Sequence, residues 1–216
     1  DGSVQLNHGG TEMGQGLYTK VAQIVATTLQ IDVGYISCTA TRTDKVPNTS
    51  PTAASSGSDL NGMAAKQAAE TLKHRLSEFA AKHFAVDTSA VQFASGHIHI
   101  GGHTLTFAEL ARLAYVNRVS LSAVGYYRTP KIHYDRSLAR GRPFYYFAYG
   151  AAVSEVIIDT LTGEYKVHRV DICHDVGESL NPALDLGQIE GGFIQGMGWV
   201  TNEELVWDLS LIHISE

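Results

Sequence analysis

The stretch GGTEMGQG at 9–16 places four glycines in eight positions and sets Glu12, Met13 and Gln15 among them. A second stretch, GGFIQGMG at 191–198, repeats the spacing G-G-x-x-x-G-x-G with one glutamine and one methionine. Glycine lets backbone approach a ligand closely, and a glycine-rich loop that runs into a helix points N–H groups at an anion. We therefore predict that the two loops form two walls of one site. The alternative is that these glycines serve close helix packing.

Outside the loops, hydrophobic periodicity predicts helices mixed with short strands. A strand at Val4–Leu6 leads into the first loop, and apolar residues at helical spacing follow from Leu17 to Thr28. Downstream, the sequence predicts a strand at 35–41, a long loop at 43–59, a helix capped by Ser58 or Asp59 that runs to Phe84, and a hairpin turning at Ser95-Gly96. A helix opened by a capping box of Thr106 and Glu109 follows, and then strand-like segments at 122–127, 144–159 and 164–176. The last helix is expected to start near Gly187-Gln188 and to run through the second glycine stretch. The expected fold class is α+β, with antiparallel hairpins and mixed sheets flanked by helices.

The composition limits the possible partners. A net charge of −6 and a pI of about 5.9 argue against a nucleic-acid surface, which needs a positive field. The longest apolar runs are too short to span a bilayer, and the first residues do not resemble a secretory signal. Cys38 and Cys173 provide neither a disulfide framework nor zinc spacing, so we expect a cytoplasmic protein.

The long loop at 43–59 carries two prolines and many small hydroxyl residues, and it has no amphipathic period. Its segment from Thr52 to Ser56, TAASS, would allow backbone to contact a bulky ligand, and its hydroxyls could bind phosphate. Long ordered loops are often functional. The alternative interpretation is a surface loop that leads into a helix cap.

Other polar residues indicate no site. His97 and His99 would face one side of a strand, but no third metal ligand follows at a suitable spacing, so we assign no histidine to a metal. Glu178, Glu203 and Glu204 could be considered as a general base, but a catalytic carboxylate needs burial or a partner that the sequence does not indicate.

Four long motifs together resemble one enzyme family. HGGTEMGQGLYTKVAQI, VPNTSPTAASSGSDLNG, GAAVSEVIIDTLTGEYKV and GESLNPALDLGQIEGGFIQGMGWVTNEELVW are similar to the molybdenum-binding large subunit in the xanthine dehydrogenase/aldehyde oxidase family. The resemblance covers residues 1–208 in order, and the TAAS core favours the xanthine dehydrogenase branch.

The resemblance implies cofactor-binding roles for three groups of residues. The loop matching Met13, Gly14 and Gln15 borders molybdopterin, and the loop matching Ala54, Ser55 and Ser56 lies beside the molybdenum. Gln188 matches a glutamine that contacts the same cofactor, whereas Gln195 is expected to support the wall. No residue of this chain is expected to ligate the metal.

The implied activity is hydroxylation of xanthine, hypoxanthine or another N-heterocycle, with water as the oxygen source. Electrons would pass through [2Fe-2S] clusters to FAD and then to NAD. The clusters and FAD would be bound by a partner subunit or domain, and the whole enzyme would be a higher oligomer. The family's catalytic glutamate lies in a Gly-Glu-Pro-Pro motif that this sequence lacks. We therefore name no catalytic residue here and expect the isolated chain to be inactive.

The resemblance also implies an internal fragment. We expect residues 1–208 to form part of a molybdopterin-binding domain, either as one unit or as two subdomains at roughly 1–120 and 121–208. We expect residues 209–216, LSLIHISE, to be a non-native tail. Two alternatives stay open. One is an aldehyde or other N-heterocycle oxidoreductase of the same family, and the other is a catalytically dead binding or assembly module.

Overall fold

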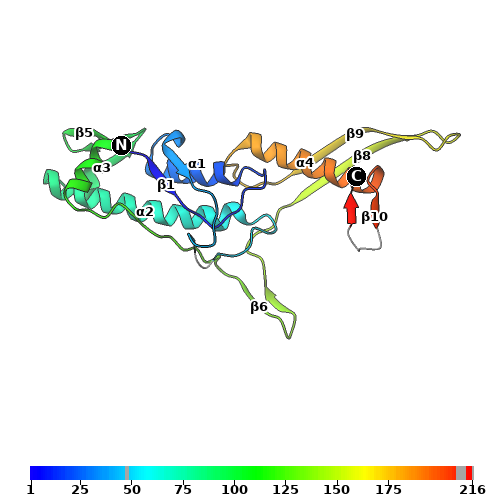
Figure 1. Ribbon diagram of the computed structural model, residues 1–216, viewed down its shortest axis with the longest axis horizontal. Helices are drawn as coiled ribbons and strands as arrows, with labels where there is room; N and C mark the ends of the chain where they lie inside the picture. Colours follow the sequence, from blue (N-terminus) through cyan, green and yellow to red (C-terminus); the bar gives the residue numbers. More distant parts are fainter. Residues whose placement is uncertain (47–48, 208–212, 216) are drawn as a thin grey trace. The chain divides into compact units, whose positions relative to one another are not determined.

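The computed structural model describes residues 1–46, 49–207 and 213–215, and the chain divides into two compact units (Figure 1). Unit 1 comprises Asp1–Lys131, and unit 2 comprises Ile132–Glu216. The architecture mixes helices with small sheets, as the α+β prediction requires. The predicted tail at 209–216 lies largely outside the described residues.

Two helices that run side by side form the centre of unit 1 (Figure 1). Helix α1 spans Leu17–Leu29, and helix α2 spans Gly57–Phe84. The first residues of the two helices lie together, because a Cβ atom placed on Gly57 would be 3.3 Å from the Leu17 side chain. The buried apolar residues of α1 repeat at helical spacing and pack on α2, as the sequence predicted: Leu17, Val21, Val25 and Leu29.

Helix α2 begins earlier than its predicted caps. Neither Ser58 nor Asp59 caps it; both lie inside its first turn, and Ser56 holds the N-cap position. The Ser56 side chain makes no capping hydrogen bond among the described residues. The prediction rested on the preference of Ser and Asp for the N-cap position. The helix instead begins at Gly57, which packs against the Leu17 side chain.

Short strands complete unit 1. Strand β1 (Val4–Leu6) pairs in parallel with β2 (Ile36–Cys38), which is shorter than the predicted 35–41. Strands β3 (Val91–Ala94), β4 (His97–Ile100) and β5 (His103–Thr106) form an antiparallel sheet, with 3-10 turns at Val33–Tyr35 and Thr88–Ala90 before β2 and β3. The hairpin turns at Ser95-Gly96, and the Thr106–Glu109 capping box opens α3 (Phe107–Val116), so both predictions are confirmed.

The strand predicted at 122–127 is wrong. This segment runs along α2 without strand pairing. The Arg75 guanidinium donates hydrogen bonds to the carbonyl oxygens of Ser120 and Ser122, at 2.9 and 2.8 Å. Gly125 lies against the Ala64 carbonyl, where a Cβ atom would clash. The apolar alternation of the segment therefore reflects contact with a helix.

Unit 2 consists of hairpins and one helix. Strands β6 (His133–Asp135) and β7 (Arg140–Arg142) pair with each other, as do β8 (Gly150–Ile158) and β9 (Tyr165–His174). The turn at Thr162-Gly163 is confirmed, but β8 begins only at Gly150, six residues later than predicted. Strands β10 (Leu205–Trp207) and β11 (His213–Ser215) form the last pair.

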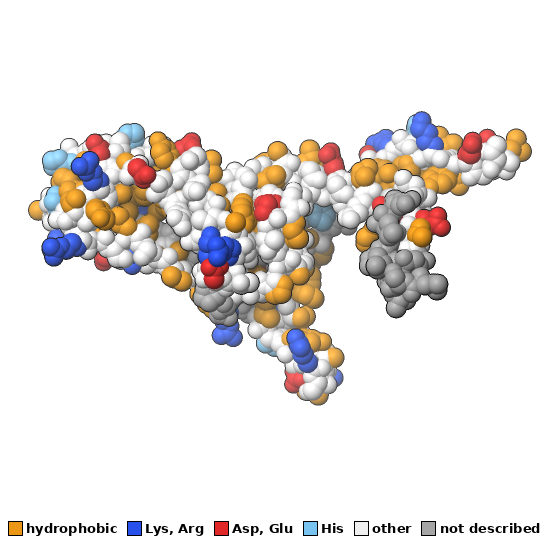
Figure 2. Space-filling model, in the orientation of Figure 1, with side chains coloured by type: hydrophobic (Ala, Val, Ile, Leu, Met, Phe, Trp, Pro, Cys, Tyr) orange, Lys and Arg blue, Asp and Glu red, His pale blue; other side chains and the backbone are white. Residues whose placement is uncertain are grey.

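Helix α4 spans Pro182–Thr201 and starts earlier than predicted. It begins five residues before Gly187, because Asn181 caps it through a hydrogen bond from the Leu184 N–H and Pro182 occupies the first turn. The stretch 191–198 lies inside this helix, so the prediction that the last helix runs through the second glycine stretch is confirmed. No side chain described between 132 and 206 is buried, and Figure 2 shows many hydrophobic side chains on the surface of the β8–β9 hairpin.

Candidate functional site

The glycine loop before α1 has the backbone conformation that its composition predicts. Gly14 has φ +101°, and Gly16, the N-cap of α1, has φ 75° and ψ 22°. L-residues rarely adopt this left-handed region, so glycine is required there. A Cβ atom on Gly14 would meet nothing within 4 Å, and the Met13 side chain is 69% exposed. The tip of the loop is therefore open to a partner.

Glu12 satisfies the N–H groups that this loop directs toward an anion. Its Oε1 accepts hydrogen bonds from the N–H groups of Gly14 and Gly16, at 2.9 and 3.0 Å. Its Oε2 accepts one from the N–H of Tyr18 at 2.9 Å. Partial burial raises the pKa of Glu12, but hydrogen bonds from the backbone, Tyr18 first, outweigh it and hold that pKa below its ordinary value. The anion at the start of α1 is thus the chain's own carboxylate.

Gln15 is also bound within the loop. Its Oε1 accepts a hydrogen bond from the Met13 N–H at 2.6 Å, and its Nε2 donates one to the Thr11 carbonyl at 2.8 Å. A primary amide has two N–H donors and two acceptor lone pairs, so one of each remains for an outside partner. Gln15 can therefore hold the loop and still contact a ligand.

The structure brings the loop at 52–56 against the glycine loop. The Thr11 N–H donates a hydrogen bond to the Thr52 hydroxyl at 2.8 Å. Ala54 and Ser55 are exposed, Ser56 is half-buried, and Ala54 has φ 55°, in the left-handed region. Two loops predicted separately thus meet where α1 and α2 begin, and they present small side chains to solvent.

His8 lies beneath the glycine loop. It is 7% exposed, and its Nδ1 accepts a hydrogen bond from the Gly10 N–H at 3.1 Å. Its ring meets that of Tyr18 edge to face, with centroids 4.9 Å apart, and the Thr41 hydroxyl lies 2.7 Å from the Tyr18 hydroxyl. Burial lowers the pKa of His8, although the nearby Glu12 carboxylate opposes the shift. A neutral imidazole therefore supports the loop from below.

The remaining predicted residue lies in unit 2. Gln188 is exposed on α4, in the turn after its first acidic residue, Asp185. Gln195 is also exposed on α4. The structure therefore brings together the residues at 13–15 and 54–56 within unit 1, whereas Gln188 belongs to the other unit.

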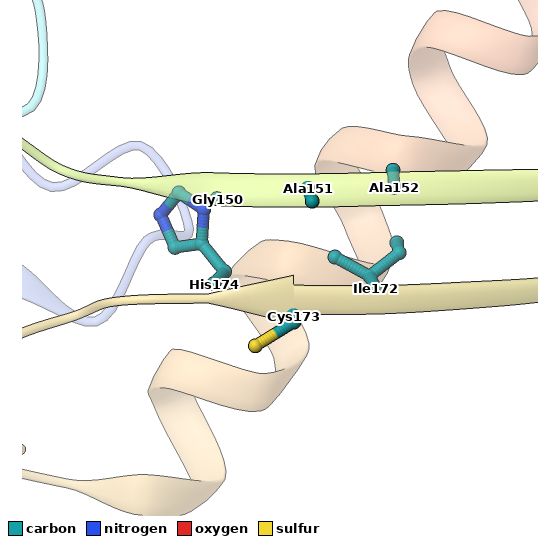
Figure 3. Close-up of a pocket in the computed structure, with 6 residues that line it drawn as sticks. All are labelled: Gly150, Ala151, Ala152, Ile172, Cys173 and His174. Carbon is teal, nitrogen blue, oxygen red and sulfur yellow. The ribbon is translucent and has the colours of Figure 1, made fainter.

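Unit 2 contains a surface hollow that is not lined by any of the predicted cofactor-binding residues. It measures about 310 Å³, lies at the base of the β8–β9 hairpin and is lined by Gly150, Ala151, Ala152, Ile172, Cys173 and His174 (Figure 3). All six residues are exposed, so the hollow is an open surface. None of the residues predicted to bind the cofactor lines it.

Among residues 1–46, 49–207 and 213–215, no group of three His, Cys, Asp or Glu side chains could hold a metal ion. Similarly, no helix in this part of the chain is long and apolar enough to cross a membrane. The junction of the two loops instead offers an amide, hydroxyls and open backbone, which suit a polar heterocyclic ligand.

Sequence reasoning did not identify Glu12 and His8. It assigned the anion of the glycine loop to a ligand, and it gave no histidine a role at the site. The sequence did carry a usable signal for Glu12. It stands two and four positions before Gly14 and Gly16, just ahead of a helix, so its carboxylate can reach their N–H groups. His8 carried no comparable local pattern.

Comparison with known proteins points to one family. The model of the molybdopterin cofactor-binding domain matches residues 1–211. The chain is 48% identical over 207 residues to a xanthine dehydrogenase of Oryza sativa subsp. japonica and 49% identical over 205 residues to the xanthine dehydrogenase/oxidase of Mus musculus, which corresponds to 96% and 95% of this chain. It spans 14% of the length of each relative. A crystal structure of a Cu,Mo-CO dehydrogenase superposes with a TM-score of 0.78 at 26% identity, over 98% of this chain and 26% of that one.

Proposed function

Because this chain belongs to the family of molybdopterin cofactor-binding domains, we propose that it is a segment of a molybdenum hydroxylase whose loops at 11–16 and 52–56 hold the cofactor. The observation that carries the proposal is the Thr11–Thr52 hydrogen bond, which joins two open loops where two helices begin. Loops with glycines and small side chains let a flat pterin come close to the backbone and form hydrogen bonds with it.

The residues present fit such a group. Met13 and Gly14 leave the tip of the glycine loop open, and Gln15 keeps one N–H donor and one acceptor site for the pterin. The small side chain of Ala54 would leave room for the molybdenum, and Ser55 offers an exposed hydroxyl. Ser56 holds the N-cap position of α2 without capping it through its side chain, so its hydroxyl oxygen could still accept a hydrogen bond from the cofactor.

Each element has a separate task in this proposal. The bound cofactor supplies the redox chemistry of hydroxylation with water as the oxygen source. The residues of unit 1 bind and orient it: Gln15 through amide hydrogen bonds, and Ser55 and Ser56 through hydroxyls. His8 and Glu12 contact the loop and Tyr18 in the first turn of α1, and no contact with the cofactor is proposed for either. No side chain named here is proposed to move a proton, so the isolated chain should be inactive. Turnover of xanthine by this chain alone would contradict that expectation.

We further propose that the parent enzyme oxidises xanthine or hypoxanthine and passes electrons through [2Fe-2S] clusters and FAD to NAD. The 48% identity to a xanthine dehydrogenase supports this choice over an aldehyde substrate. A purine is electron-poor beside its nitrogens, which suits attack by a water-derived nucleophile. Steady-state oxidation of xanthine and of a simple aldehyde by the full-length protein distinguishes the two substrates.

The direct test of cofactor binding is to place bulk at Ser55 in the full-length protein. Ser55→Phe should lower the molybdenum and pterin content per protomer about tenfold, since overpacking of a binding site costs about 1–3 kcal/mol. Ser50→Phe, at an exposed position of the same loop, is the matched control and should stay loaded. Equal loading of both variants would place the cofactor elsewhere. A wild-type protein without pterin would leave only the binding-module alternative.

A further inference from the structure

The glycine loop holds its shape through its own side chains. Glu12, Gln15 and His8 together bind five backbone N–H groups of residues 10–18. All of these contacts lie within residues 8–18, so the loop keeps its shape without an outside partner. Such loops do not need to fold when a ligand arrives, and the binding cost of ordering them is removed.

Glu12 has the central place among these contacts. Its carboxylate spans three of the five N–H groups, two within the loop and one in the first turn of α1. Hydrogen bonds to a charged acceptor are about twice as strong as neutral ones. Gly14 and Gly16 both have left-handed φ values, and their N–H groups point to the same oxygen. The carboxylate therefore fixes the two residues that have the widest choice of backbone conformation.

We propose that Glu12 is a positioning residue for the cofactor: it fixes the loop at 11–16 in its binding conformation before the cofactor arrives. This inference rests on the proposed function. It assigns Glu12 no contact with the cofactor. Its negative charge also neutralises the positive end of α1.

The chain contains a matched control in Glu109. Its Oε2 accepts hydrogen bonds from the N–H and the hydroxyl of Thr106, both at 2.8 Å, and it caps α3. Both glutamates thus stabilise a helix start in unit 1. Helix α3 lies toward the C-terminal end of α2, whereas the loops lie where α2 begins (Figure 1). Loss of either cap should lower stability, but only Glu12 should affect the cofactor.

The test uses the full-length protein, prepared without cofactor and then loaded with molybdopterin. In the apo protein, Glu12→Ala should speed amide hydrogen exchange in residues 14–18 about tenfold or more, because each hydrogen bond to a charged group contributes about 1.5–3 kcal/mol. The Kd for molybdopterin should rise about tenfold. Glu12→Gln keeps one acceptor oxygen, so it should recover part of the affinity. Glu109→Ala should lower the Tm and leave the Kd unchanged.

Three results would overturn the inference. Wild-type affinity in Glu12→Ala would show that the carboxylate does not position the loop. Equal losses of affinity in Glu12→Ala and Glu109→Ala, in proportion to Tm, would show a general effect of stability. In both cases a loaded wild-type protein leaves the proposed function standing. A wild-type protein that binds no molybdopterin overturns both the inference and the proposed function.

Discussion

The buried His8 should make the stability of unit 1 depend on pH. Burial lowers the pKa of His8 in the folded chain below the value of about 6.5 that an unfolded chain has. The unfolded chain therefore binds a proton first as the pH falls. The contribution of His8 to the free energy of unfolding is fully present above about pH 6.5 and is lost as the pH falls toward its lowered pKa.

Urea unfolding between about pH 8 and about pH 5 tests this expectation. His8→Asn keeps an oxygen that can accept from the Gly10 N–H, costs about 1–3 kcal/mol at pH 8 and should flatten the dependence. The same exchange at the exposed His97 should retain the wild-type slope. An unchanged slope in His8→Asn would show that His8 is not the responsible group.

The left-handed conformation at Gly16 supports a second prediction at this scale. Gly16→Ala should lower the free energy of unfolding by about 1–2 kcal/mol, because φ 75° crowds a Cβ atom against its own backbone. Gly102 has no left-handed φ, and a Cβ atom there would meet open space. Gly102→Ala should therefore stay within about 0.5 kcal/mol of wild type. Equal effects in the two variants would contradict the argument from backbone strain.

Individual residues also show what the sequence can predict. Gly14, Gly16 and the Thr106–Glu109 box were readable because φ preference and capping act within a few positions. The burial of His8 depends on a contact with Tyr18 and on the packing of the whole unit. The sequence alone carries no local signature of such contacts.

Among the elements, the packing of α1 against α2 depends on a glycine in α2. A Cβ atom on Gly62 would be 2.5 Å from the Cδ1 of Ile24. Gly62→Ala gains about 1 kcal/mol of helix propensity, but the Cδ1 methyl group of the half-buried Ile24 must turn aside, so we expect little net change in stability. Ile24→Val removes the clashing methyl group and alone should cost about 0.5–1.5 kcal/mol.

A double-mutant cycle measures this contact. The double variant should be more stable than the sum of the single effects predicts, with a coupling of about 0.5–3 kcal/mol. Chemical denaturation of the four proteins gives the value. Additive effects would mean that Ile24 can move aside without cost.

Element boundaries were harder to predict than element types. Helix α4 was expected to start near Gly187, but the Asn181 cap and Pro182 in the first turn start it five residues earlier. The segment at 122–127 alternates like a strand, yet Arg75 and α2 hold it along a helix. In both cases the deciding contact lies outside the window in which periodicity is read.

At the scale of the molecule, the family and the α+β class were predictable, because long motifs and hydrophobic periods extend over most of the chain. The division of buried apolar side chains between the two units was not predictable. Every buried apolar side chain among the described residues belongs to unit 1, although unit 2 carries apolar residues in β8, β9 and α4. Composition counts apolar residues but does not show which of them find a partner.

This division predicts different behaviour for the two units expressed separately. Residues 1–131 contain a continuous core around α1 and α2 and should unfold in one cooperative transition, as domains of this size usually do. Residues 132–216 have no buried side chain in the part described, with Ile158 61% and Val200 82% exposed. They should show no cooperative melting and should bind a hydrophobic dye. Calorimetry and dye fluorescence on the two pieces provide the test. A sharp thermal transition in residues 132–216 would mean that the hairpins and α4 bury apolar surface that this structure leaves exposed.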